Sequence, residues 1–312
     1  MNKKRLIKKI ISWSGLFFFA LAVFMIYKQL AKYSLNDITS AINAVPNISI
    51  IYACIASFLG YLALSSYDYL ALKYIKRKLA IWKWIFVGFI GFAISNNAGH
   101  AIVSGGAIRY RMYTRWRVNS TDILRMVMFS GFTYLVACFF LVILGIFLSP
   151  QHVISGFSSP LITNIILALS IAGIVFYVWG STYYKKTIII KDISFHAPGF
   201  KLAIEQILIG SIDILMASLV LYSILINYID IPFLAFIGVY IIAQLLGVYS
   251  QVPGGLGVFE IVFAKLLPEG QDQAVLFAIL ILYRIIYYLL PLIISGIALI
   301  SYEFLRKKIN IR

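Results

Sequence analysis

The chain has 312 residues, of which 62% are hydrophobic and only 12% are charged, and its mean hydropathy is +0.94. Because a soluble domain carries about 25% charged residues, this composition excludes an ordinary soluble protein and indicates a chain whose surface lies in lipid. The formal net charge of +16 would suit nucleic acid as well as anionic lipid, so the placement of the basic residues decides between these partners.

Apolar runs follow one another along the whole chain. A helix needs about 20 apolar residues to cross the hydrocarbon core of a bilayer. Runs of roughly this length lie near 12–30, 48–70, 122–148, 161–183, 203–226, 232–250 and 274–302. The first run follows a basic start, as in a signal peptide, but it is long and lacks a clear small-residue cleavage site, so we expect it to be retained. The sequence therefore predicts an all-α, polytopic integral membrane protein with about eight transmembrane helices.

Two further apolar stretches, about 82–103 and 252–268, are interrupted by glycine and polar residues. The segment SNNAGHAIVSGGAIRYRMYTRWR, from Ser95, passes through paired glycines into four arginines, and QVPGGLGVFE, from Gln251, again sets paired glycines beside an ionisable residue. This recurrence, about half a chain apart, predicts an inverted internal repeat with broken helices. The alternative is that the glycines only let helices pack closely. The predicted break residues are Gly105, Gly106, Pro253, Gly254, Gly255 and Gly257.

Most of the 27 basic residues lie in short patches beside the apolar runs. The patches cover 1–9, 73–83, 109–125, 185–201 and 306–312, whereas the connections 150–160 and 227–231 contain neither Lys nor Arg. Cytoplasmic loops of membrane proteins carry an excess of Lys and Arg. We therefore expect a bacterial inner-membrane protein with cytoplasmic N- and C-termini, whose basic loops face anionic lipid headgroups and not nucleic acid.

Placing every basic patch on one side constrains the two broken stretches. Basic patches flank 82–103, so this stretch has to enter and leave on the same side as a re-entrant hairpin, which is tolerated where protein or water shields its backbone. The stretch 252–268 then has to reach the far side, which leaves Glu269 and Asp272 outside before the last run returns.

Ionisable residues inside apolar runs are costly, by roughly 2.5–3.5 kcal/mol each at a helix centre, and they are therefore candidates for function. The candidates for a headgroup or translocation path are Asp68, Arg109, Asp213, Glu260 and Arg284. Purely structural alternatives are a helix-end position for Asp68, an interfacial position for Glu260, and a buried ion pair between Asp213 and Arg284. Helical spacing predicts that Tyr287 and Tyr288 share a face with Arg284.

No cofactor or metal is expected. The three histidines, His100, His152 and His196, lack metal-site spacing, and Cys54 and Cys138 lie within apolar runs, where packing is their simplest role. The sequence also contains no P-loop, which argues against direct use of ATP.

The two glycine-containing segments are similar to the two signature segments of the lysylphosphatidylglycerol synthase transmembrane family. That family includes the flippase half of the multiple peptide resistance factor and stand-alone YbhN-type proteins. GSIDILMASLVLY, from Gly210, resembles a third family segment, and the resemblance covers essentially the whole chain. It implies lipid translocation, with Asp68, Arg109, Asp213 and Glu260 at positions that match the family's polar translocation residues. Arg284 is a candidate from its depth alone.

Bifunctional members of that family continue into a soluble aminoacyl-transfer domain. No connection between the apolar runs here exceeds about twenty residues, which is too short for such a domain. We therefore expect one transmembrane lipid-flippase domain over 1–312, with repeat halves of about 1–160 and 161–312. The expected partners are the membrane and a phospholipid substrate of aminoacylated or anionic phosphatidylglycerol type. The alternatives are a membrane-embedded phosphatidylglycerol lysyltransferase, an accessory subunit of a separate lipid synthase, and a homodimer.

Overall fold

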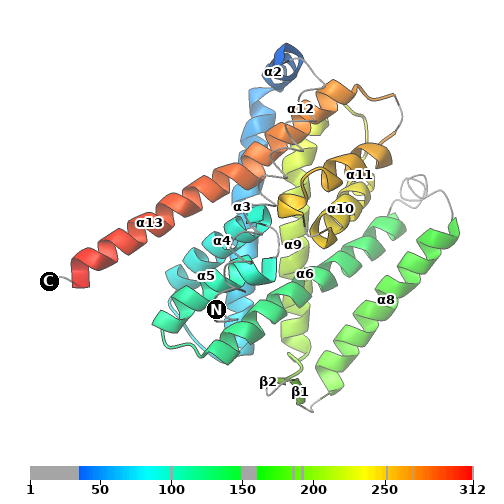
Figure 1. Cartoon of the computed structure of the whole chain (residues 1–312). Coiled ribbons are helices and arrows are strands. Elements are labelled where there is room, and N and C mark those ends of the chain that lie inside the picture. The colour runs from blue at the N-terminus through cyan, green and yellow to red at the C-terminus, as the bar shows by residue number, and fades with distance from the viewer. Residues whose placement is uncertain are drawn as a thin grey trace, which may run out of the picture.

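The computed structural model describes residues 35–98, 101–148, 160–184, 187–190, 193–250, 252–268 and 270–310. This part of the chain is almost entirely helical (Figure 1). The helices are α2 (Leu35–Asn43), α3 (Asn47–Tyr74), α4 (Ile81–Ala98), α5 (Ala101–Arg115), α6 (Ser120–Leu148), α8 (Pro160–Tyr183), α9 (Phe200–Leu225), α10 (Phe233–Tyr249), η1 (Pro253–Gly255), α11 (Val258–Leu266), α12 (Gln273–Arg284), η2 (Ile285–Leu289) and α13 (Leu290–Asn310). The strands β1 (Ile188–Ile190) and β2 (Ile193–Phe195) form a short antiparallel hairpin.

Helices of membrane-spanning length confirm an all-α, polytopic membrane protein. Among the described residues, those long and apolar enough to cross a bilayer are Asn47–Tyr74, Ser120–Phe147, Leu161–Tyr183, Phe200–Leu225 and Gln273–Arg306. Helix α10 is apolar but has only 17 residues. The predicted run 12–30 lies outside the described residues. Most of the other predicted runs therefore correspond to spans, and 232–250 does not.

Helices α3 and α9 run antiparallel through the middle of the bundle (Figure 1). Ser49 near the start of α3 accepts a hydrogen bond from Asn227, just past the end of α9, at 3.0 Å. At the opposite ends, Lys73 of α3 pairs with Glu205 of α9. Close approach of the two helices is possible because Gly60 of α3 has no side chain, since a Cβ there would lie 3.3 Å from the Cβ of Met216. The pair forms the axis against which the remaining helices pack.

Helices α4 and α5 form the first hairpin. Trp82 at the start of α4 contacts Trp116 just after α5, with ring centroids 5.6 Å apart, so the chain enters and leaves this hairpin at the same place. The flanking basic patches predict a hairpin for 82–103, but these bounds are wrong. The returning arm is α5, which extends to Arg115 and contains basic residues that the prediction places in the flanking loop. The arms have 18 and 15 residues, or about 27 and 22 Å of helix.

The predicted break at Gly105 and Gly106 is wrong, because α5 continues as a regular helix through both residues. These glycines serve close packing instead. A Cβ on Gly105 would lie 2.1 Å from Oγ of Ser95 and 3.0 Å from the carbonyl oxygen of Gly91. For this pair the alternative interpretation, small residues between packed helices, is therefore correct.

Helices α10 and α11 form a second hairpin, and here the predicted break is present. Gly254, Gly255 and Gly257 have φ values of +61°, +62° and +80°, a region that residues with a Cβ adopt at a cost. Rings of the two arms contact each other, with Phe236 and Phe263 5.7 Å apart and Tyr240 and Phe259 5.8 Å apart. The chain therefore folds back on itself at the Pro-Gly-Gly turn.

This second hairpin corrects the predicted path of 252–268. Helix α11 has nine residues, about 13 Å of helix, which is far less than the thickness of the hydrocarbon core. The prediction has the chain cross the membrane inward over 232–250 and outward over 252–268. The structure instead shows one hairpin, in which the start of α10 and the end of α11 lie on the same side. The far-side position expected for Asp272 does not change, because a hairpin and a pair of crossings return the chain to the same side.

The last membrane-spanning segment is interrupted by a π-helix. Helix α12 ends at Arg284, and η2 follows over Ile285–Leu289 before α13 continues. A π turn disturbs the usual backbone ladder, and side chains of other helices satisfy the carbonyl groups. Ser57 and Tyr61 of α3 donate to the carbonyl oxygens of Ile286 and Tyr287, at 3.2 and 3.1 Å. The carbonyl oxygen of Tyr288 accepts from Asn97 of α4 at 3.1 Å.

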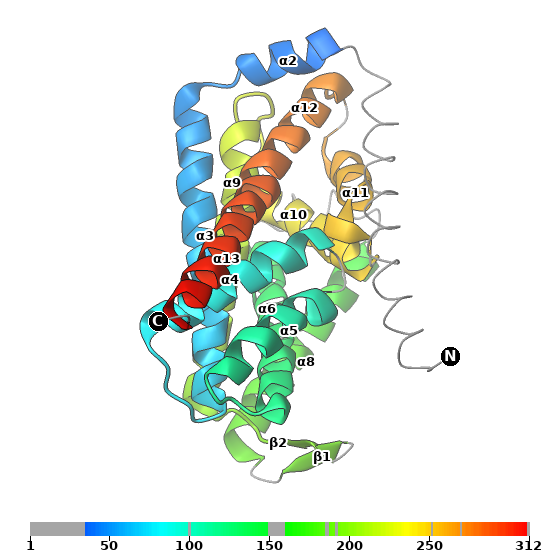
Figure 2. The ribbon, with the colours of Figure 1, turned by 60° about the vertical axis from the view of Figure 1, so that its left-hand side comes forward.

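The same order of elements occurs twice. A long helix, a two-helix hairpin and another long helix follow one another in α3–α6 and again in α9–α13. Because α3 and α9 are antiparallel, the second set runs in the opposite direction to the first. In Figure 2, α11 lies nearer to α2, and α5 lies nearer to the β-hairpin. The recurrence covers 47–148 and 200–310 and leaves α8 and the β-hairpin between the sets.

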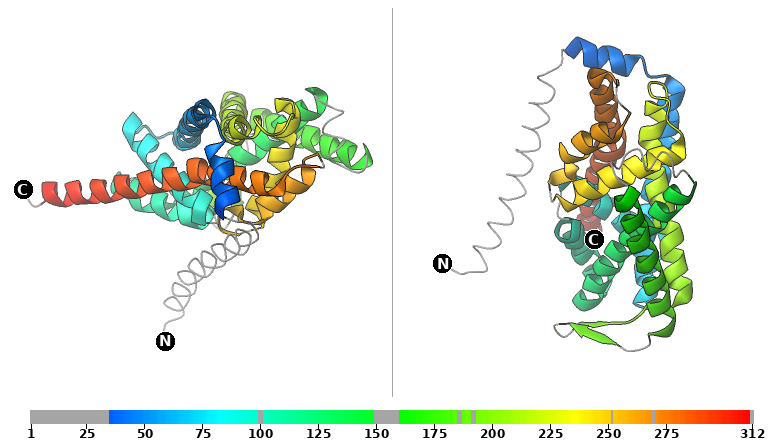
Figure 3. Two further views of the ribbon diagram at one scale, coloured as in Figure 1. Left: turned by 90° about the horizontal axis from the view of Figure 1, so that it is seen from above. Right: turned by 90° about the vertical axis from the view of Figure 1, so that its right-hand side faces the viewer.

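The basic patches of the described residues gather at the β-hairpin end of the bundle. Tyr74, at the end of α3, donates to the carbonyl oxygen of His196 at 2.8 Å, and Arg125 of α6 contacts Ser194. Glu303 of α13 pairs with Arg115 at the end of α5. Figure 3 shows α2 across the opposite end and α13 projecting away from the bundle. The charge distribution is therefore asymmetric along the bundle, as the positive-inside rule requires.

Candidate functional site: a cavity between two hairpins

A cavity of about 790 Å³ lies where the two hairpins approach each other. The tips of the hairpins are close, since a Cβ on Gly254 of η1 would lie 3.4 Å from the carbonyl oxygen of Asn96 of α4. The polar and aromatic residues of its lining are Tyr67, Phe92, Ser95, Asn96, Arg109, Ser130, Phe132, Tyr134, Asp213, Tyr240, Gln244, Tyr249, Phe259, Tyr287 and Tyr288. The volume is in the range of small-molecule sites.

The cavity extends to the outside of the bundle. Phe132 of α6 and Tyr249 of α10 belong to its lining, and they are 52% and 65% exposed. Val248, beside Tyr249, is also exposed. The opening therefore lies between α6 and α10, which pack against each other (Figure 1). Both helices are apolar, so this opening faces the region that lipid would occupy.

Arg109 reaches the cavity from α5 and is ion-paired with Asp68 of α3. Its Nε donates to Oδ1 of Asp68 at 2.8 Å, and the other carboxylate oxygen accepts from Tyr113 at 2.8 Å. The guanidinium also lies over the ring of Phe92, with Cζ 4.4 Å from the centroid. Arg109 is 2% exposed and Asp68 is fully buried. The pair therefore attaches the first hairpin to α3.

One nitrogen of Arg109 retains hydrogen-bonding capacity. Nη2 lies 2.8 Å from Oδ1 of Asp68, but it makes no aligned hydrogen bond to that oxygen or to any other described atom. A buried donor without an acceptor is costly. Arg109 belongs to the lining of the cavity, although Nη2 itself is shielded within the ion pair.

A second ion pair attaches the second hairpin. Arg284 of α12 donates through Nε to Oε1 of Glu260 at 2.8 Å and through Nη1 to the carbonyl oxygen of Gly254. The other carboxylate oxygen of Glu260 accepts from the backbone N–H of Gly257 at 2.7 Å. The guanidinium lies over Tyr288, with Cζ 4.4 Å from the ring centroid. This arginine thus holds both the turn and the helix that follows it.

The predicted ion pair between Asp213 and Arg284 is wrong. Arg284 is paired with Glu260, and Asp213 accepts a hydrogen bond from Tyr67 of α3 at 2.8 Å. Sequence alone gave no means of choosing between Asp213 and Glu260 as the partner of Arg284, because both lie in apolar surroundings. The turn decides the pairing, since it places Glu260 and the carbonyl of Gly254 on the same guanidinium.

The predicted site residues divide into two groups. Arg109 and Asp213 line the cavity. The other three, Asp68, Glu260 and Arg284, are buried in the ion pairs that hold the hairpins. Of the tyrosines expected beside Arg284, Tyr288 lies under its guanidinium, whereas Tyr287 stacks on Tyr283 at 5.7 Å and lines the cavity.

Sequence analysis missed several polar residues of the cavity. Tyr67, Asn96 and Gln244 line it, and each lies in a largely apolar helix. These residues could have been suspected from their position deep in an apolar run, because a buried amide or phenol needs a hydrogen-bond partner or a polar cavity. Tyrosine is frequent in this chain, at 21 residues, so depth alone does not single out one of them.

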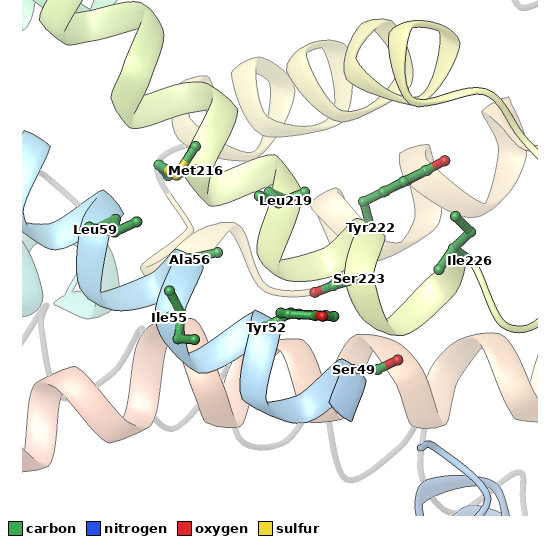
Figure 4. A pocket seen from close by; sticks show the side chains of 10 residues that line it. All are labelled: Ser49, Tyr52, Ile55, Ala56, Leu59, Met216, Leu219, Tyr222, Ser223 and Ile226. Atoms are coloured by element: carbon green, nitrogen blue, oxygen red, sulfur yellow. The ribbon is translucent and has the colours of Figure 1, made fainter. Parts of the chain in front are cut away.

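A second hollow of about 380 Å³ lies between α3 and α9 and contains none of the predicted site residues (Figure 4). Its lining is Ser49, Tyr52, Ile55, Ala56, Leu59, Met216, Leu219, Tyr222, Ser223 and Ile226. None of these side chains is charged. The hollow offers apolar surface to a lipid tail and lacks the charged groups that a headgroup requires.

Comparison with known proteins places the chain in a family. A family model described as the lysylphosphatidylglycerol synthase TM region matches residues 11–295. The chain belongs to this family. The protein slr0712 of Synechocystis is 30% identical over 297 residues, which cover 94% of this chain and 92% of that protein. The inner membrane protein YbhN of Escherichia coli K12 is 28% identical over 312 residues, which cover 98% and 95%.

Longer members of the lysylphosphatidylglycerol synthase transmembrane family are also similar. The phosphatidylglycerol lysyltransferase of Staphylococcus xylosus is 27% identical over 300 residues, which cover 92% of this chain but 33% of the enzyme. That of Staphylococcus aureus MRSA252 is 26% identical and is covered over 35% of its length. The chain thus spans about a third of the lysyltransferases that it matches.

Proposed function

We propose that this protein moves a phospholipid between the leaflets of the bacterial inner membrane. The observation that supports this proposal most is the lateral opening of a largely apolar cavity that contains a few charged and polar side chains. A soluble solute requires an entrance from water, whereas a lipid requires a polar space for its headgroup that is open sideways to the bilayer. The cavity between the hairpins has this form, with Arg109 and Asp213 inside and Phe132 and Tyr249 at the opening.

Arg109 is the group that we assign to the lipid phosphate. Arginine carries a permanent charge and presents several N–H donors in a fixed plane, which suits phosphate oxygens. Asp68 and Tyr113 hold this guanidinium in place in the lining of the cavity. An arginine suits the phosphate of any phospholipid, and similarity to the lysylphosphatidylglycerol synthase family is the reason to propose a headgroup of phosphatidylglycerol type, anionic or aminoacylated. Its acyl chains would remain in the bilayer beside α6 and α10.

The recurrent order of helices supplies a route for the headgroup. We propose that 47–148 and 200–310 are inverted repeats whose hairpins enter the membrane from opposite sides. Transporters of this design expose a central site to each side in turn. The basic end of the bundle is cytoplasmic in this proposal, together with both termini. Similarity to an inner membrane protein of Escherichia coli supports the location.

The alternative function is aminoacyl transfer to phosphatidylglycerol. Similarity to phosphatidylglycerol lysyltransferases favours it, but that similarity covers about a third of each enzyme. An accessory role beside a separate lipid synthase, or a homodimer, would use the same cavity. Incubating the purified protein with radioactive lysyl-tRNA and phosphatidylglycerol discriminates between these functions, because formation of labelled lipid would establish the enzyme.

The proposal is tested in vesicles that contain the purified protein and a headgroup-labelled phosphatidylglycerol. A quencher that cannot cross the bilayer reports how fast the label changes leaflet. We expect the wild type to accelerate this exchange over protein-free vesicles and Arg109→Lys to lose most of the acceleration, because Lys keeps the charge but not the planar fork. Arg117→Lys is the control, since Arg117 is exposed beyond the end of α5. Equal rates for both variants would remove Arg109 from the site.

A further inference from the structure

Asp213 differs from the other deeply buried carboxyl groups of the described residues. Asp68 and Glu260 are each paired with an arginine. Asp213 is 3% exposed and lies in the middle of a 26-residue helix, yet no described Lys, Arg or His pairs with it. The phenol of Tyr67 donates a hydrogen bond to its Oδ2 at 2.8 Å. An ionised carboxylate without a cation is costly inside a membrane.

The groups that face Asp213 are neutral around physiological pH. Tyr61 and Tyr67 approach from α3, Tyr134 and Cys138 from α6, and Tyr287 from η2. Phenols and thiols in apolar surroundings hold their protons. Tyr240 of α10 lines the same cavity, and α8 places no described charged group beside the carboxyl. The cation that shares the cavity, Arg109, is committed to Asp68.

From this geometry we infer that Asp213 is an exchangeable proton site and that lipid movement is coupled to proton movement. The inference rests on the proposed function. The carboxylate takes a proton from a hydronium ion in water that enters the cavity: one O–H bond of the hydronium breaks and leaves water, an O–H bond forms on the carboxylate, and the group becomes a neutral acid. When the cavity faces the other side, that bond breaks and the proton returns to water there. The hydrogen bond from Tyr67 stabilises the ionised form and keeps both states accessible.

A proton fits this site better than a metal cation. The described residues contain no group of three or more His, Cys, Asp or Glu side chains that could hold a metal ion. Hard cations require several oxygen ligands at once, whereas a proton requires one oxygen. Intramembrane carboxyl groups that line a cavity recur in proton pathways of pumps and transporters. Asp213 is therefore a carboxyl group of the cavity lining that a single proton can neutralise without further ligands.

The proton site is tested without reference to transport by infrared titration of the purified full chain in lipid nanodiscs, from about pH 5 to about pH 9. We expect a protonated-carboxyl band that disappears as the pH rises. Asp213→Asn should remove this band and Glu205→Gln should retain it, because Glu205 lies on the same helix in an exposed pair with Lys73. A band that survives in Asp213→Asn, or a carboxyl that does not titrate, would overturn the inference.

Tyr67→Phe provides a second variant in case Asp213→Asn does not fold. Loss of the donor should move the midpoint to higher pH, because the ionised form loses its hydrogen bond. An unchanged midpoint would contradict the assignment. Repeating the titration with sodium chloride in place of potassium chloride tests whether Asp213 binds a metal cation. A midpoint that depends on sodium would show that sodium, and not a proton alone, binds at Asp213, and it would contradict the inference.

Coupling is then measured in vesicles with an imposed pH gradient. The wild type should change its lipid exchange rate several-fold with the direction of the gradient, and Asp213→Asn should not respond to it. An equal response in both proteins would overturn the coupling. If the wild type moves no lipid at all, the proposed function fails, and the infrared titration still decides whether Asp213 exchanges a proton.

Discussion

At the scale of single residues, the two buried arginines, Arg109 and Arg284, stabilise the packing of the hairpins in addition to being candidate site residues. Arg109 and Arg284 each join a hairpin to a long helix through one carboxylate and an aromatic ring. A buried ion pair owes its stability to geometry, because both partners lose their water. In each pair a second donor holds the other carboxylate oxygen, namely Tyr113 for Asp68 and the N–H of Gly257 for Glu260. These second donors explain why the pairs are tolerated at this depth.

The Glu260–Arg284 pair predicts strong coupling between the two residues. Glu260→Gln and Arg284→Gln should each lower the free energy of unfolding by about 3 kcal/mol or more, because each leaves one buried charge without a partner. The double variant should lose less than the two single losses combined. Denaturant titration in detergent measures all three.

An exposed ion pair provides the control for this coupling. Lys73 and Glu205 have side chains that are 36% and 26% exposed, so replacing either should cost below about 1 kcal/mol. Strictly additive losses at Glu260 and Arg284 would show that the pair does not stabilise the second hairpin.

At the scale of elements, the two hairpins are built by different means. The second turns at Pro253–Gly255, where glycines adopt positive φ values. In the first, α5 continues through its glycine pair as a regular helix, and Gly105 instead lets α5 approach α4. The charge pattern was sufficient to predict that the chain turns back near the first glycine pair, but not that the returning arm is α5, which itself carries Arg109, Arg111 and Arg115. The short α11 could not be predicted in the same way, since no charge marks where its helix begins.

Two adjacent glycines of α5 test the packing role. Gly105→Ala should push α4 and α5 apart, because its Cβ would meet Ser95 Oγ at 2.1 Å and the backbone oxygen of Gly91 at 3.0 Å. We expect a loss of about 1–3 kcal/mol, as for other overpacked positions. Gly106→Ala places its Cβ 3.8 Å from Val127, which is ordinary contact, and the better helix propensity of Ala should leave it neutral or slightly stabilised. Thermal unfolding of both variants measures the change in stability. Equal losses of stability in the two variants would contradict the packing role of Gly105.

At the scale of the whole molecule, the described basic patches gather at one end of the bundle, and the long helices connect that end with the α2 end. The asymmetry predicts the orientation of every loop. Accessibility tags near Lys76, Arg115, Lys186 and Arg312 should report the cytoplasm, whereas tags near Ser155 and Gly270 should report the opposite side. An external signal near Arg115 would contradict the first hairpin, and a cytoplasmic signal near Gly270 would contradict the second.

The extent to which sequence predicts this structure follows from which interactions are local. Apolar length located α3, α6, α8 and α9, because each run carries its own information about the bilayer. Depth also identified Asp213 and Arg109 as residues of interest. Their partners could not be derived, since Tyr67 and Asp213 are 146 positions apart and meet only because α3 and α9 run antiparallel. The π turn after Arg284 could not be predicted from the sequence either, because hydrogen-bond donors from the distant helices α3 and α4 stabilise it.

The central claim is that lipid passes through the cavity between the hairpins, and Gly131 gives the most direct test of it. This residue lines the cavity on α6 at its exposed edge, and a Cβ there would meet nothing within 4 Å, so the side chain added by Gly131→Leu starts in open space at the cavity opening. Gly180 of α8 is equally open but lies outside the lining, which makes Gly180→Leu the matched control. The measurement is the rate at which labelled phosphatidylglycerol changes leaflet in vesicles with equal amounts of each protein. We expect Gly131→Leu to lose at least tenfold in rate, a change in barrier of about 1.4 kcal/mol, and Gly180→Leu to match the wild type. Equal rates for all three proteins, or a wild type no faster than empty vesicles, would contradict the claim.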